Sequence, residues 1–395
     1  MTTPPEFRWD WSAPRQVCFG WGRRKELGEL AQTVGRRAWL VCGSRTLKAD
    51  SLWQEMLHSL ESAGVPALDL ATLTREPLVA DVDDAVRSLT NAGLADGDFL
   101  LAIGGGSAID LAKAVAALAP QSASTSALEY LEGVGTGRKL IEAPLPVFAV
   151  PTTSGTGAEA TRNAVISSFD PTFKKSLRSP RMVPQVALLD PELTVSNSPQ
   201  VTAHSGLDAL TQLLESYISR RAAPLTDNLC LEGLQGIIPA LKSAYRDGTT
   251  PEPRIRMAYA AHLSGLALAN SGLGIAHGLA AALGVHADVP HGLACAAMLP
   301  LALRINAQVA GEKLARVAAL WDAPPSLGVD SSIQFVRDRI DELLHELHIP
   351  RTWNGLVVKR EQIRAIVRSS HGNSRDGNPC SITDEELTSL LEEIP

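Results

Sequence analysis

The chain has 395 residues, of which 45% are hydrophobic and 20% charged, which predicts two or three domains or one large α/β unit with a second lobe. A net charge of −7 without any block of Lys and Arg speaks against a nucleic-acid partner, and we find neither a signal peptide nor an apolar stretch long enough to cross a membrane. The five cysteines are scattered without zinc-ribbon spacing, which indicates free thiols, so we expect a cytoplasmic protein: Cys18, Cys42, Cys230, Cys295 and Cys380.

The first half of the chain alternates short apolar segments with segments of helical periodicity. We predict helices at 47–60 and 79–89, and another that starts at the glycine turn after residue 103. The predicted strands are residues 37–42, 65–70, 98–103, 147–150 and 186–189. Strands that are apolar almost throughout and alternate with helices predict a mostly parallel sheet that is covered on both faces.

The second half of the chain has few β-branched runs and many helical ones. The predicted helices lie near 206–219, 226–245, 253–271, 294–308, 311–321, 331–347, 361–369 and 384–393. Thr383 and the acidic residues that follow it are typical of a helix start. We therefore expect an α/β domain over residues 1–195 and an all-α domain over residues 196–395.

A glycine turn follows the predicted strand at 98–103 and opens a helix. Gly105, Gly106 and Ser107 allow the backbone to approach a phosphate closely, and the helix N-terminus supplies N–H donors and partial positive charge. Asp110 lies in the first turn of the same helix. A plain tight turn between a strand and a helix is the alternative interpretation.

A second glycine-containing loop, PTTSGTGAE, follows the predicted strand at 147–150. Thr152, Thr153 and Thr156 are part of a dense set of hydroxyl donors for phosphate or ribose oxygens. Ligands of open α/β sheets bind at the carboxyl ends of the strands, which favours a binding loop over a solvated turn.

A mixed set of metal-binding side chains occurs in the helical half. Asp208 and Gln212 are four residues apart and share one face of a predicted helix, while His277 and His291 lie in glycine-flanked apolar segments. One carboxylate, one amide oxygen and two imidazoles suit a divalent transition metal such as iron or zinc. A structural role for each histidine is the alternative.

Six segments of the chain occur in an order that is specific to one protein family. They are GGGSAIDLAK, PTTSGTGAEAT, LLDPELT, GLDALTQLLESY, NSGLGIAHGLAAALG and DVPHGLACAAMLP. Together they resemble the iron-containing alcohol dehydrogenase family, and the resemblance extends from about Pro14 to the C-terminus. It implies a dehydroquinate synthase-like fold, with an α/β dinucleotide-binding domain and an all-α metal-binding domain.

The resemblance also implies roles for particular residues. NAD(P) would bind with its pyrophosphate on Gly105, Gly106 and Ser107, lined by the threonine loop and by Lys174. The substrate would be an alcohol–aldehyde pair. The metal, Fe²⁺ or Zn²⁺, would polarise the carbonyl of the aldehyde. Its ligands and catalytic partners map onto Asp208, Gln212, His277 and His291. The family further implies a homodimer or a larger homo-oligomer.

Two histidines that are usual in the family are replaced in this chain. Gln212 stands at a metal-ligand position and supplies a weaker, neutral donor, while Ala281 stands where a histidine beside the nicotinamide would relay protons. A metal-independent reductase resembling maleylacetate reductase therefore stays open, as does a cofactor-binding pseudoenzyme. Glycerol dehydrogenases and dehydroquinate synthases share the fold but fit these segments less well. We interpret His286 as a surface histidine and assign no role to His204.

The end of the first predicted strand bears on cofactor choice. Members that prefer NAD tend to carry an aspartate there, whereas this chain has Gly43, Ser44 and Arg45. A hydroxyl and a guanidinium in place of a carboxylate favour a 2′-phosphate, so we predict a preference for NADP(H) over NAD(H). The alternative is that Arg45 only caps the next helix.

Overall fold

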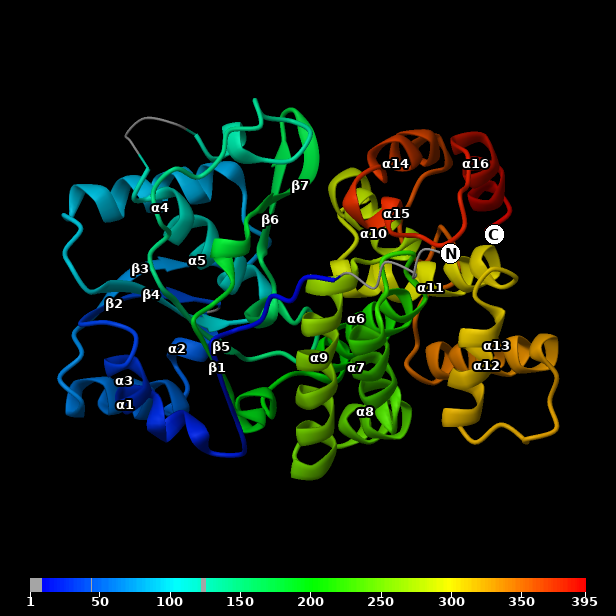
Figure 1. The fold of residues 1–395 in the computed structure, drawn as a ribbon, viewed down its shortest axis with the longest axis horizontal. Coiled ribbons are helices and arrows are strands. Elements are labelled where there is room, and N and C mark those ends of the chain that lie inside the picture. The colour runs from blue at the N-terminus through cyan, green and yellow to red at the C-terminus, as the bar shows by residue number, and fades with distance from the viewer. Residues whose placement is uncertain (1–8, 44, 122–125) are drawn as a thin grey trace, which may run out of the picture.

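The computed structural model describes residues 9–43, 45–121 and 126–395 of the chain. Within them it has an N-terminal α/β lobe and a C-terminal helical lobe, which lie side by side (Figure 1). The last strand of the sheet ends at Leu189 and the first long helix of the second lobe begins at Pro199. The predicted combination of an α/β part and an all-α part is confirmed.

Six parallel strands form the sheet of the first lobe, in the order β1-β8-β5-β4-β2-β3. Their bounds are β1 Gln16–Phe19, β2 Arg37–Cys42, β3 Ala67–Thr72, β4 Asp98–Gly104, β5 Val147–Pro151 and β8 Val186–Leu189. The helices of this lobe are α1 Leu27–Gln32, α2 Arg45–Lys48, α3 Ser51–Ser62, α4 Val79–Asn91 and α5 Gly106–Leu118.

Alternate residues of the central strands belong to two separate cores. Leu101 and Ile103 of β4 pack in the core that contains α1 and α3 residues, whereas Leu100 and Ala102 pack in the core of α4 and α5. Both faces of the sheet are therefore buried, which explains why its central strands are continuous apolar runs.

An antiparallel hairpin, formed by β6 (Asn163–Phe169) and β7 (Thr172–Arg178), extends from the first lobe toward the second (Figure 1). We did not predict strands here. The hairpin carries Lys174 and Lys175 in consecutive positions of β7, so it lacks the simple apolar–polar alternation that marks a half-buried strand. It nevertheless brings both lysines to the space between the lobes.

Eleven helices of the described residues form the second lobe. They are α6 Pro199–Ile218, α7 Pro224–Leu234, α8 Ile237–Arg246, α9 Pro251–Ser271, α10 Ile275–Ala287, α11 His291–Asn306, α12 Gly311–Leu320, α13 Val329–Glu346, α14 Ile363–Ser369, α15 Asn373–Asp376 and α16 Asp384–Glu392. Short 3-10 helices lie at Arg23–Glu26, Ala127–Tyr130, Ala158–Ala160, Pro180–Met182, Pro191–Thr194 and Arg360–Gln362.

The helical lobe differs from the prediction at four places, one of which is the short helix α15 (Asn373–Asp376), which was not predicted. The single helix expected at 226–245 is two helices, because Gly236 adopts a left-handed conformation with φ of 69° between α7 and α8. Helix α6 begins at Pro199 rather than 206, where the Ser198 side chain accepts a hydrogen bond from the Val201 N–H. Helix α10 was not predicted, because it is apolar on nearly all sides and shows no amphipathic stripe.

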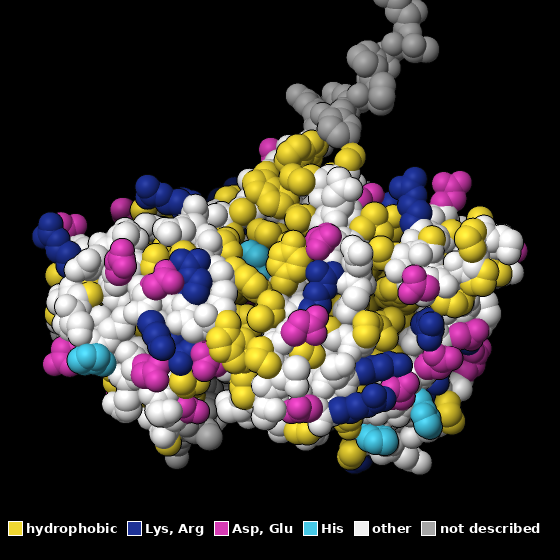
Figure 2. Space-filling model, turned by 90° about the horizontal axis from the view of Figure 1, so that it is seen from below, with side chains coloured by type: hydrophobic (Ala, Val, Ile, Leu, Met, Phe, Trp, Pro, Cys, Tyr) yellow, Lys and Arg dark blue, Asp and Glu magenta, His cyan; other side chains and the backbone are white. Residues whose placement is uncertain are grey.

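Surface charge on the face shown in Figure 2 is mixed. Lys and Arg side chains alternate there with Asp and Glu side chains, and no extended patch of positive charge is visible. Among the described residues, no helix alone has the length and apolar character to cross a membrane; α9 and α10 meet that test only as a pair, bent by 102° at their junction.

Two glycines bring the backbones of the two lobes into direct contact. Gly157, in the threonine loop of the first lobe, has φ of 59°, and Gly265 lies in the middle of α9. A Cβ built on Gly265 would lie 2.4 Å from the Gly157 carbonyl oxygen. The approach of the threonine loop to the helical lobe therefore requires glycine at both positions.

We predict that Gly265→Ala destabilises the protein by about 1–3 kcal/mol, because the added methyl forces the two backbones apart. Helix propensity alone would change stability in the opposite direction, by roughly 0.5–1 kcal/mol. The free energy of unfolding in urea measures the effect. Gly328→Ala is the control, since no atom lies within 4 Å of a Cβ at that position. A Gly265→Ala variant as stable as the wild type would contradict the prediction.

Candidate active site

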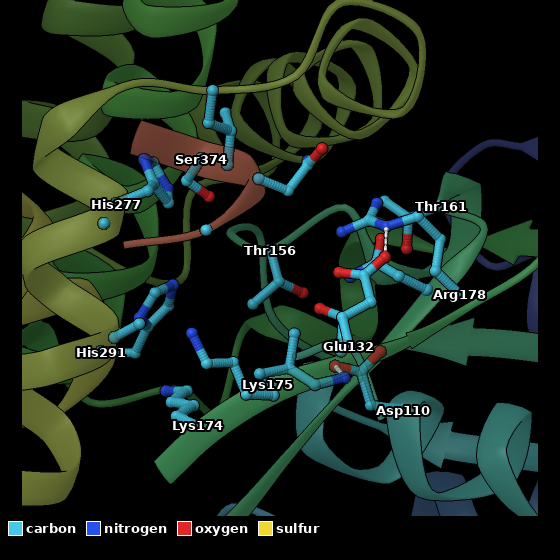
Figure 3. A pocket seen from close by; sticks show the side chains of 18 of the residues that line it. Asp110, Glu132, Thr156, Thr161, Lys174, Lys175, Arg178, His277, His291 and Ser374 are labelled. Carbon is cyan, nitrogen blue, oxygen red and sulfur yellow. Dashed lines mark hydrogen bonds and ion pairs between the residues drawn. The ribbon is translucent and has the colours of Figure 1, made fainter. Parts of the chain in front are cut away.

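A cleft of about 410 Å³ lies between the lobes and contains most of the predicted site residues. Figure 3 shows its lining: His277 and His291 lie at one end, Lys174 and Lys175 next to them, and Thr156 further along. The opposite end is lined by Asp110, Glu132 and Arg178, and the segment from Ser369 to Ser374 closes another side.

The glycine turn opens α5 toward this cleft. Gly106 and Ser107 line it, and no side chain caps the N-terminus of α5 at Gly105. A Cβ on Gly106 would lie 2.5 Å from Thr156 Oγ1, and one on Gly105 would lie 3.3 Å from Thr153 Oγ1. The turn and the threonine loop thus form a close-fitting cradle at a helix N-terminus, which fits a dinucleotide phosphate.

Two other predicted cofactor residues have structural partners. Asp110 accepts a hydrogen bond of 3.0 Å from the Val165 N–H and forms an ion pair of 2.9 Å with Lys113, so it joins α5 to the hairpin. The Thr152 N–H donates to the Gly104 carbonyl and its own carbonyl accepts from Asn197 Nδ2. Both residues hold the cradle in place, and Asp110 also lines the cleft.

Gly43 follows β2 and packs directly against the glycine turn. A Cβ there would lie 2.7 Å from Gly104 Cα and 3.1 Å from the Gly105 backbone nitrogen. This close packing requires glycine whichever cofactor binds, so Gly43 alone carries no information on NADP(H) preference. Ser44 lies outside the described residues, and the structure describes the backbone of Arg45 but not its side chain.

Three of the predicted metal ligands, Asp208, His277 and His291, lie close together at one end of the cleft. His277 Nε2 lies 3.2 Å from Asp208 Oδ1, and His291 Nε2 lies 3.8 Å from the same oxygen. Cys295, to which we assigned no role, supplies a fourth donor, and one atom from each of the four residues lies within 4.8 Å of the others. This set of oxygen, nitrogen and sulfur donors fits a divalent transition metal.

The carboxylate of Glu215 orients His277. Its Oε2 accepts a hydrogen bond of 2.6 Å from His277 Nδ1, and it also accepts backbone N–H groups of Gly274, Ala276 and His277. Burial opposes the charged form, but Cys295, Asp208 and Glu215 raise the pKa of His277 overall, so Nε2 must release its proton to bind a cation while Glu215 keeps the proton on Nδ1. Such a carboxylate–histidine pair is a common support for metal ligands.

Gln212 lies beside this cluster, with its side chain buried at the cleft. Its Oε1 is 2.6 Å from the hydroxyl of Ser264, which donates a hydrogen bond to it. One lone pair of the amide oxygen is thus already used. The predicted role of Gln212 as a metal ligand stays a prediction.

The charges of the cluster influence one another strongly. Burial opposes ionisation of Asp208, but the nearby His291 and His277 lower the pKa of its carboxyl overall. Burial together with the Lys174 ammonium lowers the pKa of His291 to about 4, so this imidazole is neutral and able to bind a cation. Burial raises the pKa of the Cys295 thiol to about 12, so an uncoordinated Cys295 is protonated.

The remaining histidines do not join the cluster. His286 is partly exposed, and its Nε2 lies 2.7 Å from the Ser369 hydroxyl. His204 is half-buried, and its carbonyl packs against Gly292 at the start of α11. Ala281 lines the cleft, and its methyl side chain cannot relay a proton.

Lys174 is held in the cleft by an ion pair of 2.6 Å with Glu76, a residue that the sequence analysis did not identify. Burial opposes ionisation of Glu76, but Lys174 lowers the pKa of its carboxyl overall. Glu76, Glu215 and Cys295 were missed because a single acid or thiol in an apolar helix or a loop has no distinctive spacing.

We predict that Glu215→Gln weakens zinc binding by about 10- to 100-fold, because the amide no longer fixes the charge and tautomer of His277. Competition with a chromophoric chelator measures the dissociation constant. Glu159→Gln is the matched control: Glu159 is equally buried and lies 3.0 Å from His262, and none of its described hydrogen bonds reaches the cluster. Unchanged zinc affinity in Glu215→Gln would refute the orienting role.

Comparison with known proteins agrees with this geometry. The family model "Iron-containing alcohol dehydrogenase" matches residues 14–191, and "Fe-containing alcohol dehydrogenase family, C-terminal" matches residues 202–394. Alcohol dehydrogenase 4 of Saccharomyces cerevisiae (strain YJM789) is 31% identical over 377 residues, which cover 95% of each chain. Lactaldehyde reductase of Escherichia coli (strain K12) is 30% identical over 94% of this chain and 96% of its own.

A solved structure of 1,3-propanediol oxidoreductase superposes with a TM-score of 0.90 at 29% identity, covering 98% of this chain and 99% of the other. The family models span both lobes, and the curated and structural matches are nearly full-length. The chain therefore belongs to the iron-containing alcohol dehydrogenase family, and is an NAD(P)-linked oxidoreductase of the alcohol dehydrogenase and aldehyde reductase class.

Proposed function

We propose that this chain transfers a hydride between NADP(H) and a small alcohol–aldehyde pair in the cleft between its lobes. One observation carries the proposal. The cradle at the N-terminus of α5 and the cluster of Asp208, His277 and His291 lie at the same cleft. When bound, the nicotinamide supplies or accepts the hydride, and a divalent metal, Fe²⁺ or Zn²⁺, polarises the carbonyl.

The side chains of this chain would position and stabilise the reactants. Gly105, Gly106 and Ser107 would bind the pyrophosphate, with Thr152, Thr153 and Thr156 beside it. Lys174, held by Glu76, places a positive charge close to His291. Asp208 is buried and supplies the negative charge that holds a cation, rather than acting as a proton donor.

Proton transfer differs from the pattern that the resemblance implies. Ala281 lines the cleft and carries no exchangeable proton. We propose that the substrate oxygen exchanges its proton with water that enters the cleft. The loss of this relay distinguishes the chain from family members that carry histidine there.

We propose NADP(H) as the preferred cofactor on the basis of Ser44 and Arg45, since Gly43 has a packing role of its own. Arg45→Gln should lower kcat/KM for NADPH by about 10- to 100-fold and leave kcat/KM for NADH nearly unchanged, because a charged hydrogen bond to the 2′-phosphate is lost. Arg87→Gln, which alters an exposed ion pair on α4, is the control. An equal effect of Arg45→Gln on both cofactors would contradict the preference.

Removal of the metal tests the reaction itself. We expect chelator-treated protein to lose NADPH oxidation with short aldehydes, and Fe²⁺ or Zn²⁺ to restore it, because the proposed reaction relies on the metal to polarise the carbonyl. Activity that is indifferent to metal would instead establish a metal-independent reductase. Cofactor binding without turnover on any aldehyde would favour a pseudoenzyme.

The oligomeric state and the cellular location are proposed on separate grounds. We propose a homodimer on the basis of the family resemblance, to be checked by light scattering. None of the cysteines in the described part of the chain forms a disulfide bond, as expected in a reducing compartment, so we propose a cytoplasmic protein.

A further inference from the structure

A buried thiol lies among the metal-binding side chains. Helix α11 begins at His291, and Cys295 is one turn further along, so the two side chains share a face of the helix. Cys295 Sγ lies 3.7 Å from His291 Nε2, and the Cys295 side chain is fully buried. Two donors from α11 thus face Asp208 of α6 and His277 of α10.

Three of the donor separations are close to those of a tetrahedral site. Bonds of about 2.0–2.3 Å from a zinc-sized ion place tetrahedral donors roughly 3.3–3.8 Å apart. The observed separations are 3.2 Å for Asp208–His277, 3.8 Å for Asp208–His291 and 3.7 Å for His291–Cys295. All four donor atoms lie within 4.8 Å of one another.

Gln212 is the competing donor, and it is less suited to the task. Its amide oxygen is neutral and already accepts the hydrogen bond of Ser264. A thiolate adds a second negative charge to that of Asp208, and the two together balance a divalent cation. The amide of Gln212 balances none of that charge.

We propose that Cys295 is the fourth protein ligand of the metal, in place of the imidazole that Gln212 replaces. The proposal rests on the proposed function only in placing a metal at this cluster. On binding, a metal–sulfur bond forms and the thiol proton passes to solvent. His277, His291 and Gln212 line the cleft whereas Asp208 and Cys295 do not, so Cys295 would hold the metal from the side away from the cleft.

Metal preference is the first consequence. A sulfur donor is softer than an amide or imidazole and favours Zn²⁺ or Co²⁺ over harder ions. Gln212, which is uncharged, lies where the proposed metal site borders the cleft. A substrate oxygen could therefore approach the metal from that side as a further ligand. Some catalytic zinc sites expand to five ligands in the transition state.

Cobalt substitution gives a direct readout of a sulfur ligand. We expect the wild-type protein loaded with Co²⁺ to show a thiolate-to-cobalt charge-transfer absorption in the near ultraviolet, and Cys295→Ser to lose it. Cys230→Ser is the matched control, because Cys230 is equally buried but lies on α7, and it should keep the absorption. Absence of this absorption from the wild-type spectrum would overturn the proposal even if a variant folds poorly.

Affinity separates the two candidate donors. Cys295→Ala should weaken zinc binding by at least about 10-fold, whereas Gln212→Ala should change it little. Adding Gln212→His to Cys295→Ala should restore affinity without restoring the charge-transfer absorption. Loss of affinity in Gln212→Ala but not in Cys295→Ala would overturn the proposal.

The failure of this inference is distinguishable from failure of the proposed function. Cobalt binding without the charge-transfer absorption excludes the thiolate ligand, while metal-dependent NADPH oxidation would still stand. If the wild-type protein binds none of Co²⁺, Zn²⁺ and Fe²⁺, both the ligand set and the metal-dependent reaction are overturned, and NADPH oxidation by the metal-free protein identifies what remains.

Discussion

The carboxylate of Glu215 lies buried between α6 and α10 and satisfies several groups that would otherwise be unpaired. It accepts hydrogen bonds from backbone N–H groups at the start of α10, those of Gly274, Ala276 and His277, and from the Nδ1 of His277. Gly274 allows this approach, because a Cβ there would lie 2.7 Å from Glu215 Oε1. Since Asp208 lies two turns earlier on the same helix, α6 fixes both a ligand and the orientation of its partner.

Much of the α/β lobe could be predicted because burial on both faces leaves a strong signal. The central strand β4 is apolar at nearly every position and is followed directly by a glycine turn and the start of α5. The β6–β7 hairpin gave no such signal, since its exposed and buried residues do not alternate strictly. Helix α10 was missed for the opposite reason: it is buried on almost every side, so its apolar residues form no stripe.

The sequence predicted only those site residues that lie in segments resembling the family. Asp208, His277 and His291 were identified, and the fold brings them within a few ångströms although nearly seventy residues separate Asp208 from His277. Cys295 reads in the sequence as one more apolar residue of a buried helix. Only the crossing of α11 with α6 and α10 shows that its sulfur meets the other donors, and no local pattern encodes that crossing.

The packing of Gly43 against Gly104 has a consequence for redesign of cofactor use. A carboxylate at the end of β2 is the usual means of selecting a free ribose, but here its Cβ would collide with main chain rather than with a movable side chain. The two strand ends would have to separate first, which would disturb the very turn that receives the phosphates. An engineer who wishes to change the nucleotide must therefore work on the residues after Gly43, where the chain leaves the sheet.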